Sequence, residues 1–409
     1  MEWKLDSILS VEREMKFLVD IQTAAKPAQF CALVPWYSGH DEETFQTSRI
    51  GRWYGRLVAL VLLLSTIKLA EGVIFESGQY RLLTSAQGDT EEINRTIETL
   101  LCMFSYTMMA LSSVQNASRH CRILKDSAGI DEFLDACGYR RKYSCRWLGI
   151  LVAMASLGVL GVAFYYIHYR SDIKMKRQVH LMLFYSLQLL YSTVFSLYLN
   201  TMFMNLAQRI GFLNQRLEDF SLTETEGACD RDSWRELSNM IEVLCKFRYI
   251  TENLNSVAGV ALLFFFGFSF YTVTNQSYLA FATLTSIAGS VSSQSETANT
   301  MGLSCAWVVA ETITMAIICN ACDCLASETN ATAQILARVY GKSKHFQNLI
   351  DKYLTKSIKQ DLEFTAYGFF SIDNSTLFKI FSAVTTYLVI LIQFKQLEDS
   401  KVEDIATNT

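Results

Sequence analysis

Hydrophobic residues are gathered into long blocks that polar connections separate, rather than into short amphipathic periods. Seven blocks reach or approach the roughly 20 residues that a helix needs to cross a hydrocarbon core about 30 Å thick. The pattern therefore predicts an all-α integral membrane protein with seven transmembrane helices. They cover residues 57–75, 97–114, 147–167, 181–206, 257–273, 301–322 and 378–394.

The first block is the weakest, because Lys68 and Glu71 lie inside its outer end, where long side chains can reach the interface. The apolar stretch 30–36 is too short to span. It is predicted to be an interfacial or buried segment before the first helix.

Positive charge gives the orientation of these helices. Lys and Arg number 26 in the N-terminal segment and in the second, fourth and sixth connections, and 9 on the opposite side. Because cytoplasmic segments carry the excess of Lys and Arg, the N-terminus is predicted to be cytoplasmic and the C-terminus extracellular. The first 30 residues also contain charges throughout, unlike a signal peptide.

The long inner connections, 207–256 and 323–377, are polar but keep helical spacing, as at Ile210, Leu213 and Leu217. Helices four to six are therefore predicted to extend well beyond the bilayer. The alternative is flexible cytoplasmic loop.

Composition excludes several classes of protein. Of 409 residues, 51% are hydrophobic and 19% charged, against about 25% charged in soluble domains. The net charge of −4 offers nucleic acid no basic field. Only two prolines occur, which argues against a rhodopsin-like receptor with proline-kinked helices. The sequence has no phosphate-binding loop, metalloprotease motif or nucleophile elbow, so neither an enzyme nor a cofactor is expected.

Cysteines and glycosylation sequons add little. None of the 11 cysteines falls in a predicted external loop, so no disulfide framework is expected. The closely spaced cysteines between Cys319 and Cys324 lack a second pair or a nearby histidine, which favours buried or palmitoylated thiols over a metal site. Of the sequons, Asn94 and Asn275 would face the lumen and are candidate glycosylation sites close to the membrane.

Polar residues inside the sixth block share one helical face. Thr300, Ser304, Trp307, Glu311 and Thr314 follow at spacings of four, three, four and three. Glu311 would lie near mid-bilayer, where a carboxylate is costly and faces a partner, a cavity or a pathway. Two readings stay open: a ligand pocket, or a hydrogen-bonded packing residue.

Aromatic and amphipathic side chains crowd the outer halves of other blocks. Such residues suit a pocket that stacks on a small organic molecule and hydrogen-bonds it, although an interfacial aromatic belt accounts for some of them. The candidate ligand-binding residues are Tyr165, His168, Tyr185, Gln188, Tyr191, Tyr271, Trp307 and Glu311.

The last block carries a thin polar stripe, because Ser382, Thr386, Val389 and Gln393 share a face at spacings of four, three and four. One stripe cannot form a pore alone. Several copies around a symmetry axis could line one; ordinary hydrogen bonds between helices are the alternative.

The C-terminal sequence Thr-Tyr-Leu-Val-Ile-Leu-Ile-Gln-Phe, residues 386–394, resembles the Thr-Tyr, five hydrophobics, Gln-Phe signature of insect gustatory receptors. Residues 364–373 resemble that family's approach to the seventh helix. The resemblance implies a tetrameric ligand-gated cation channel of the plasma membrane in dendrites of gustatory neurons, as a homotetramer or with related receptors. Its ligand would be a small tastant, bound in the outer half of each subunit.

The resemblance also assigns residues to the pore. The last helix would be split near residues 373–376 and line the pore, with Gln393 and Phe394 at the outer constriction and Thr386 and Tyr387 supporting it. The implied division is 1–56, a cytoplasmic segment; 57–322, a six-helix ligand-sensing bundle; 323–377, a cytoplasmic anchor; 378–394, the pore helix; and 395–409, an extracellular tail.

One residue departs from the pattern of many sugar receptors, which have Glu after the Thr-Tyr pair, where this chain has Leu388. A bitter or otherwise aversive ligand is therefore favoured over a sugar. The alternatives are a fructose-type receptor channel and a seven-helix receptor that signals through a cytoplasmic partner. A transporter using Glu311 is a third, without an inverted repeat to support it.

Overall fold

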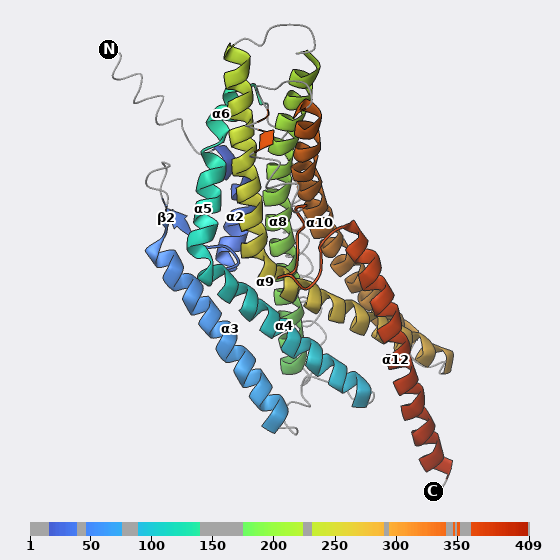
Figure 1. Cartoon of the computed structure of the whole chain (residues 1–409). Helices are drawn as coiled ribbons and strands as arrows, with labels where there is room; N and C mark the ends of the chain where they lie inside the picture. The colour runs from blue at the N-terminus through green and yellow to red at the C-terminus, as the bar shows by residue number, and fades with distance from the viewer. Residues whose placement is uncertain are drawn as a thin grey trace.

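The computed structural model describes residues 16–38, 46–75, 89–139, 175–223, 231–289, 294–340, 347, 350, 351 and 361–407. Most of these residues are helical (Figure 1). The helices are α2 (Lys16–Phe30), α3 (Arg49–Phe75), α4 (Asp89–Gln115), α5 (Ala117–Ala128), α6 (Asp131–Ala136), α8 (Met175–Thr223), α9 (Arg231–Gly289), α10 (Gln294–Tyr340) and α12 (Asn374–Thr407). Strands β1 (Tyr37–Ser38) and β2 (Gln46–Thr47) pair antiparallel, with Tyr37 opposite Thr47.

Five described helices are long and apolar enough to cross a membrane, within Arg49–Lys68, Thr96–Gln115, Arg235–Leu284, Ser304–Arg338 and Asn374–Leu397. They contain all or most of the first, second, fifth, sixth and seventh predicted spans. The fourth predicted span is helical within α8. The third, residues 147–167, lies outside the described residues. The chain is thus a helical, multi-pass membrane protein.

The three central helices are longer than any bilayer requires, with 49 residues in α8, 59 in α9 and 47 in α10. At 1.5 Å per residue they extend for roughly 70–90 Å. Their polar ends remain helical because one face of each is apolar and buried, including Leu213 and Leu217 in α8 and Leu237 and Leu244 in α9. The predicted continuation of these helices into the polar connections is confirmed for residues 207–223, 231–256 and 323–340, whereas residues 361–373 are irregular.

The N-terminal segment packs onto this bundle. Helix α2 contacts α8, and residues Cys31 to Val34, within the short apolar stretch, are buried as predicted. The β-hairpin then leads into α3, which begins at Arg49 rather than at residue 57. In its first turns Gly51 and Gly55 are buried while Arg52 and Arg56 are exposed, and Ala59 and Leu62 continue the buried side along the helix.

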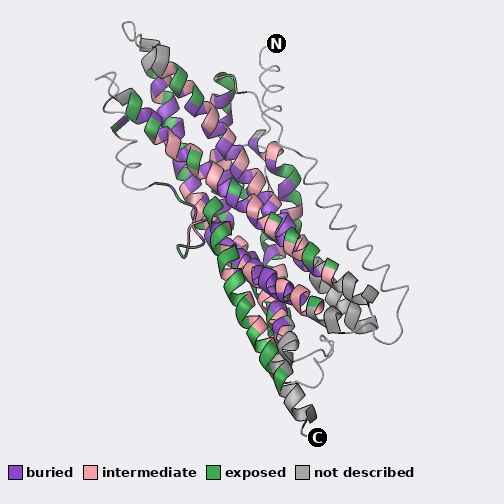
Figure 2. Ribbon diagram, turned by 90° about the vertical axis from the view of Figure 1, so that its right-hand side faces the viewer, coloured by how far each residue is buried: buried purple, intermediate pink, exposed green. Residues whose placement is uncertain are grey.

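Helix α12 lies along α9 and α10 at one edge of the molecule (Figures 1 and 2). Val384 is buried in this contact, but most of the helix is exposed on the single chain (Figure 2). The helix does not end at Phe394 as predicted and continues to Thr407. The residues that follow Phe394 include Lys395, Gln396 and Leu397, which favour helix, and neither Gly nor Pro.

Candidate functional site

The Glu311 carboxylate is the meeting point of three helices. Glu311, on α10, is 2% exposed. Ser269 Oγ of α9 donates to Glu311 Oε2 at 3.0 Å, and Ser192 Oγ of α8 donates to Oε1 at 3.5 Å. The Gln188 amide of α8 interacts with the same carboxylate, although neither of its polar atoms makes a hydrogen bond of good geometry. A buried carboxylate supported mainly by neutral donors retains capacity to bind a donor or a cation.

Aromatic rings adjoin this carboxylate. Tyr191, the residue before Ser192, stacks on Tyr106 of α4 with ring centroids 4.6 Å apart. Phe268, the residue before Ser269, meets the same Tyr106 edge-on at 6.0 Å. Within the described residues, the buried hydroxyls of Tyr106 and Thr272 form no hydrogen bond of good geometry. Rings, a carboxylate and unsatisfied hydroxyls together are the mixture of groups found in pockets for small organic ligands.

A second buried carboxylate, Glu98 of α4, is 1% exposed and faces α9. Asn275 Nδ2 donates to Glu98 Oε2 at 2.7 Å, and Gln276 Nε2 approaches Oε1 at 3.4 Å. Tyr271, a predicted ligand residue, donates instead to the backbone carbonyl of Asn94 at 3.2 Å. Helix α9 therefore connects the Glu98 and Glu311 carboxylates.

Sequence reasoning missed Glu98 because it lies at the start of its predicted span, where a carboxylate could reach the interface. The available signal was the four-residue spacing of Asn94, Glu98, Cys102 and Tyr106, all of which are buried on one face of α4.

The burial of Asn94 and Asn275 bears on the two glycosylation candidates. A glycan on Asn275 is incompatible with its contact to Glu98, and Asn94 is only 8% exposed.

The structure brings some of the other predicted ligand residues together and not others. Gln188 interacts with Glu311, and Tyr191 stacks on Tyr106 of α4. Trp307 is half-buried one turn before Glu311 on α10. Tyr165 and His168 lie outside the described residues, as does the side chain of Tyr185.

The polar stripe of α12 points away from the rest of the chain. Ser382, Thr386, Val389 and Gln393 are all exposed, whereas Val384 is buried. At 100° per residue, the stripe lies on the side of the helix opposite Val384. Tyr387, on the flank, packs edge-on against Phe270 of α9 at 5.7 Å.

Two asparagines hold the segment that precedes α12. Asn330 of α10 donates to the carbonyl of Leu362 at 3.0 Å and accepts from its amide at 2.9 Å. Asn255 of α9 donates to the carbonyl of Glu363 at 2.9 Å and accepts from the amide of Thr365 at 3.1 Å. Each asparagine side chain thus hydrogen-bonds one backbone carbonyl and one backbone amide of this irregular segment. These bonds fix the position of the segment against α9 and α10.

Asp373, the residue that precedes α12, forms a capping box with Thr376. Asp373 Oδ1 accepts from the backbone amide of Thr376 at 2.8 Å, and Thr376 Oγ1 accepts from the amide of Asp373 at 3.1 Å. A hydrogen bond from the Ser375 side chain, with those from Thr376, lowers the pKa of Asp373. The start of α12 at Asn374 falls where the resemblance implies a break in the last helix.

We expect Asp373→Ala to weaken only the first turn of α12, by about 1 kcal/mol, because it removes the cap. Amides in that turn should exchange with deuterium about fivefold faster. Asp373→Asn, which retains a capping oxygen, should exchange like the wild type. Equal exchange in all three proteins would show that the cap contributes nothing.

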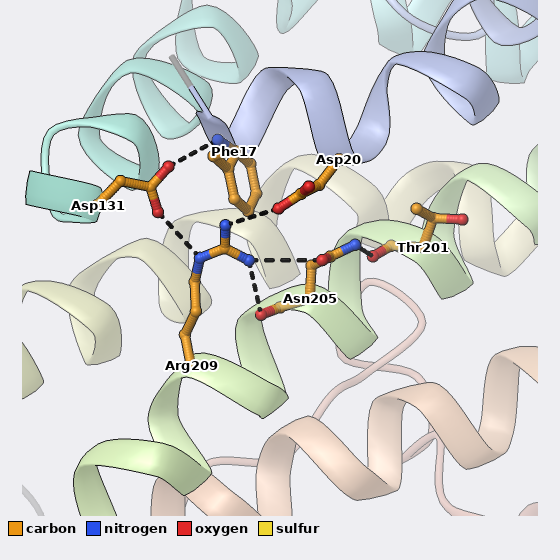
Figure 3. A network of polar contacts seen from close by, with 6 residues as sticks. All are labelled: Phe17, Asp20, Asp131, Thr201, Asn205 and Arg209. Carbon is orange, nitrogen blue, oxygen red and sulfur yellow. Dashed lines mark hydrogen bonds and ion pairs between the residues drawn. The ribbon is translucent and has the colours of Figure 1, made fainter. Parts of the chain in front are cut away.

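A buried ion network ties the N-terminal helix to the bundle (Figure 3). Arg209 of α8, 1% exposed at its side chain, donates through Nε to Asp131 Oδ1 and through Nη2 to Asp20 Oδ2, both at 3.1 Å. Asp131 also accepts from the backbone amide of Phe17 at 2.6 Å. The guanidinium lies 4.8 Å from the Phe17 ring centroid. These contacts join α2, α6 and α8.

No group of three or more His, Cys, Asp or Glu side chains with metal-binding geometry occurs among the described residues. Cys319 and Cys322 are buried free thiols, and Cys324 is a half-buried one.

Comparison with known proteins shows the family of the chain. The family model described as "7tm Chemosensory receptor" matches residues 24–398. Gustatory receptor 68a of Drosophila melanogaster is 71% identical over 393 residues, which are 96% of this chain and 100% of that protein. Gustatory and pheromone receptor 32a of the same species is 34% identical over 94% of this chain and 87% of its own.

The fold matches a solved structure. The insect olfactory receptor OR5 from Machilis hrabei, in complex with eugenol, superimposes with a TM-score of 0.63 over 91% of this chain and 97% of that one, at 12% identity. At that identity the likeness shows the fold alone. The family model matches most of the chain, and residues 386–394 resemble the gustatory receptor signature. The chain therefore belongs to the insect chemosensory receptor family and is similar to its gustatory receptors.

Proposed function

We propose that this protein is a gustatory receptor that works as a ligand-gated, non-selective cation channel, assembled from four subunits that are identical or related. The observation that carries the proposal is the exposure of α12 on the single chain. Its span is apolar yet almost uncovered on the single chain, and its polar stripe faces away from the subunit's own bundle. In a symmetric assembly such stripes would meet around a central axis.

Ligand binding is assigned to the cluster around Glu311. Its carboxylate joins α8, α9 and α10, and α9 and α10 are the helices on which α12 packs. A ligand that draws these three helices together would therefore act on the helices that support the pore. Such a coupling needs only that the ligand bind one arrangement of the helices better than the other.

The chemistry of the cluster favours a small molecule with an aromatic or aliphatic body and one donor or cationic group. Tyr191 and Phe268 offer apolar and π surface, and Glu311 offers an acceptor. This description fits bitter or other aversive compounds better than a sugar, whose many hydroxyls would need many polar partners. A contact pheromone is a second candidate, because the relative 32a carries that term in its name.

The test is whole-cell recording from cells that express this chain alone or with related subunits, without an added G-protein pathway. Bitter compounds, sugars and cuticular lipids are applied. We expect an agonist-evoked cation current within milliseconds. Slow responses that depend on a cytoplasmic second messenger would support the rival receptor without a pore, and an external N-terminus would contradict the predicted orientation.

For the pore, we expect Gln393→Ala to shift the reversal potential or raise the basal leak while surface expression persists, because the stripe would line the conduction path. Phe394→Ala should do the same if it forms the outer constriction. Ile392→Ala, a similar truncation on the flank of α12, is the matched control. Unchanged permeation in Gln393→Ala and Phe394→Ala would remove both residues from the pore.

A further inference from the structure

The start of α3, strand β2 and α5 lie close together at one side of the molecule (Figure 1). An open cavity of about 370 Å³ lies between them. Its lining carries three cationic side chains, two hydroxyls, an amide and a thiol: Arg52, Arg122, Lys125, Thr47, Ser118, Gln46 and Cys121. No acidic side chain is among these lining residues. The cavity is thus a concentrated positive charge in a chain whose net charge is −4.

The fold creates this concentration of charge. Helix α5 is amphipathic: His120, Cys121, Leu124 and other residues of one face are buried, while Ser118 and Arg122 are exposed and Lys125 is half-exposed on the other. Arg52 comes from α3 and is exposed. The approach of β1–β2 to α3 requires Gly51, since a Cβ there would lie 2.1 Å from that of Trp36.

Among the residues that the structure describes, no acid forms an ion pair with the three cations, Arg52, Arg122 and Lys125. By contrast, Arg209 and Arg216 each pair with a carboxylate. Unneutralised like charges around one cavity repel each other, and the electrostatic free energy falls when an anion occupies the space between them.

The surroundings of the cavity indicate a membrane surface. Ile50, Trp53 and Leu57 on α3 are 82%, 70% and 59% exposed, and Phe30 is 68% exposed. Trp and large aliphatic residues in such a belt mark the depth of the lipid headgroups. In the predicted orientation this end of α3 is cytoplasmic, where the leaflet carries anionic lipids that attract juxtamembrane Lys and Arg.

We propose that this cavity binds the phosphorylated headgroup of an anionic lipid of the inner leaflet. Two guanidinium groups can each hold a phosphate through paired hydrogen bonds, Lys125 adds a point charge, and the hydroxyls of Thr47 and Ser118 can donate to further phosphate oxygens. A headgroup with more than one negative charge matches three cations better than a phosphodiester alone. The site is separate from Glu311 and from α12.

The test measures binding of a short-chain phosphatidylinositol bisphosphate to the purified full-length receptor by native mass spectrometry. Arg52→Gln with Arg122→Gln removes one cation from α3 and one from α5, and we expect the affinity to fall at least about tenfold. Arg56→Gln with Arg119→Gln is the matched control, because it removes one exposed arginine from each of the same helices outside the cavity. The control should bind within about twofold of the wild type.

Three outcomes would overturn the proposal. Equal losses in both double variants would mean diffuse attraction to a basic surface. No binding by the wild type would mean that the three cations do not hold a phosphorylated lipid headgroup. Soluble inositol trisphosphate competing as well as the lipid at equal concentration would make the ligand a free phosphate. Arg52→Lys with Arg122→Lys should retain part of the affinity, which separates lost charge from misfolding.

Discussion

Arg209→Met should strongly reduce the amount of folded receptor. The substitution leaves Asp20 and Asp131 without the guanidinium that both contact in a largely buried site. Breaking a buried pair in this way costs about 3–5 kcal/mol, a large fraction of the stability of most proteins. The cation–π contact with Phe17 is lost as well. We expect α2 to detach from α8 and surface expression to fall steeply.

The measurement is thermal unfolding of the solubilised receptor, followed by size-exclusion chromatography, together with surface labelling. Arg216→Met is the matched control, because Arg216 pairs with Glu236 at 2.8 Å but both side chains are about 40% exposed. Such a surface pair contributes about 0–1 kcal/mol. Arg209→Lys, which retains the charge without the planar fork, should fall between the two. Equal stability of Arg209→Met and Arg216→Met would contradict the structural role of the network.

Glu311→Gln should reduce agonist potency about ten- to hundredfold with little change in maximal current. Glutamine has the same shape and can still accept from Ser269, so packing is preserved. What it lacks is the negative charge, and a hydrogen bond to a charged group contributes about 1.5–3 kcal/mol. Dose–response curves in whole-cell recordings measure the shift, using whichever agonist the screen identifies.

Glu98→Gln is the control for that experiment, because Glu98 is equally buried but is held by Asn275 and Gln276. We expect its effect on potency to be smaller, since those amides already occupy the carboxylate. Loss of folded protein in Glu311→Gln would make Glu311 a packing residue. Equal potency shifts in the two variants would mean that any uncharged substitute loosens the bundle.

The linear pattern of apolar and polar residues determined much of the fold. Blocks of about 20 apolar residues are sufficient to predict helices in a bilayer, because backbone groups in lipid must be satisfied within the helix. The spacing of Ile210, Leu213 and Leu217, three and then four residues apart, likewise predicted that α8 continues beyond the membrane, since a helix places all three on one face and a strand does not. Glu311 could be singled out because charge in an apolar block is conspicuous.

Only the tertiary structure decided which polar residues meet. Arg209, Asp20 and Asp131 are separated by more than 70 residues along the chain, and each alone is an ordinary charge in a polar connection. Glu98 and Asn275 are 177 residues apart. Periodicity gives the face on which a side chain lies but not the neighbouring helix that covers it, because the rotation and neighbours of a helix depend on packing against all the others.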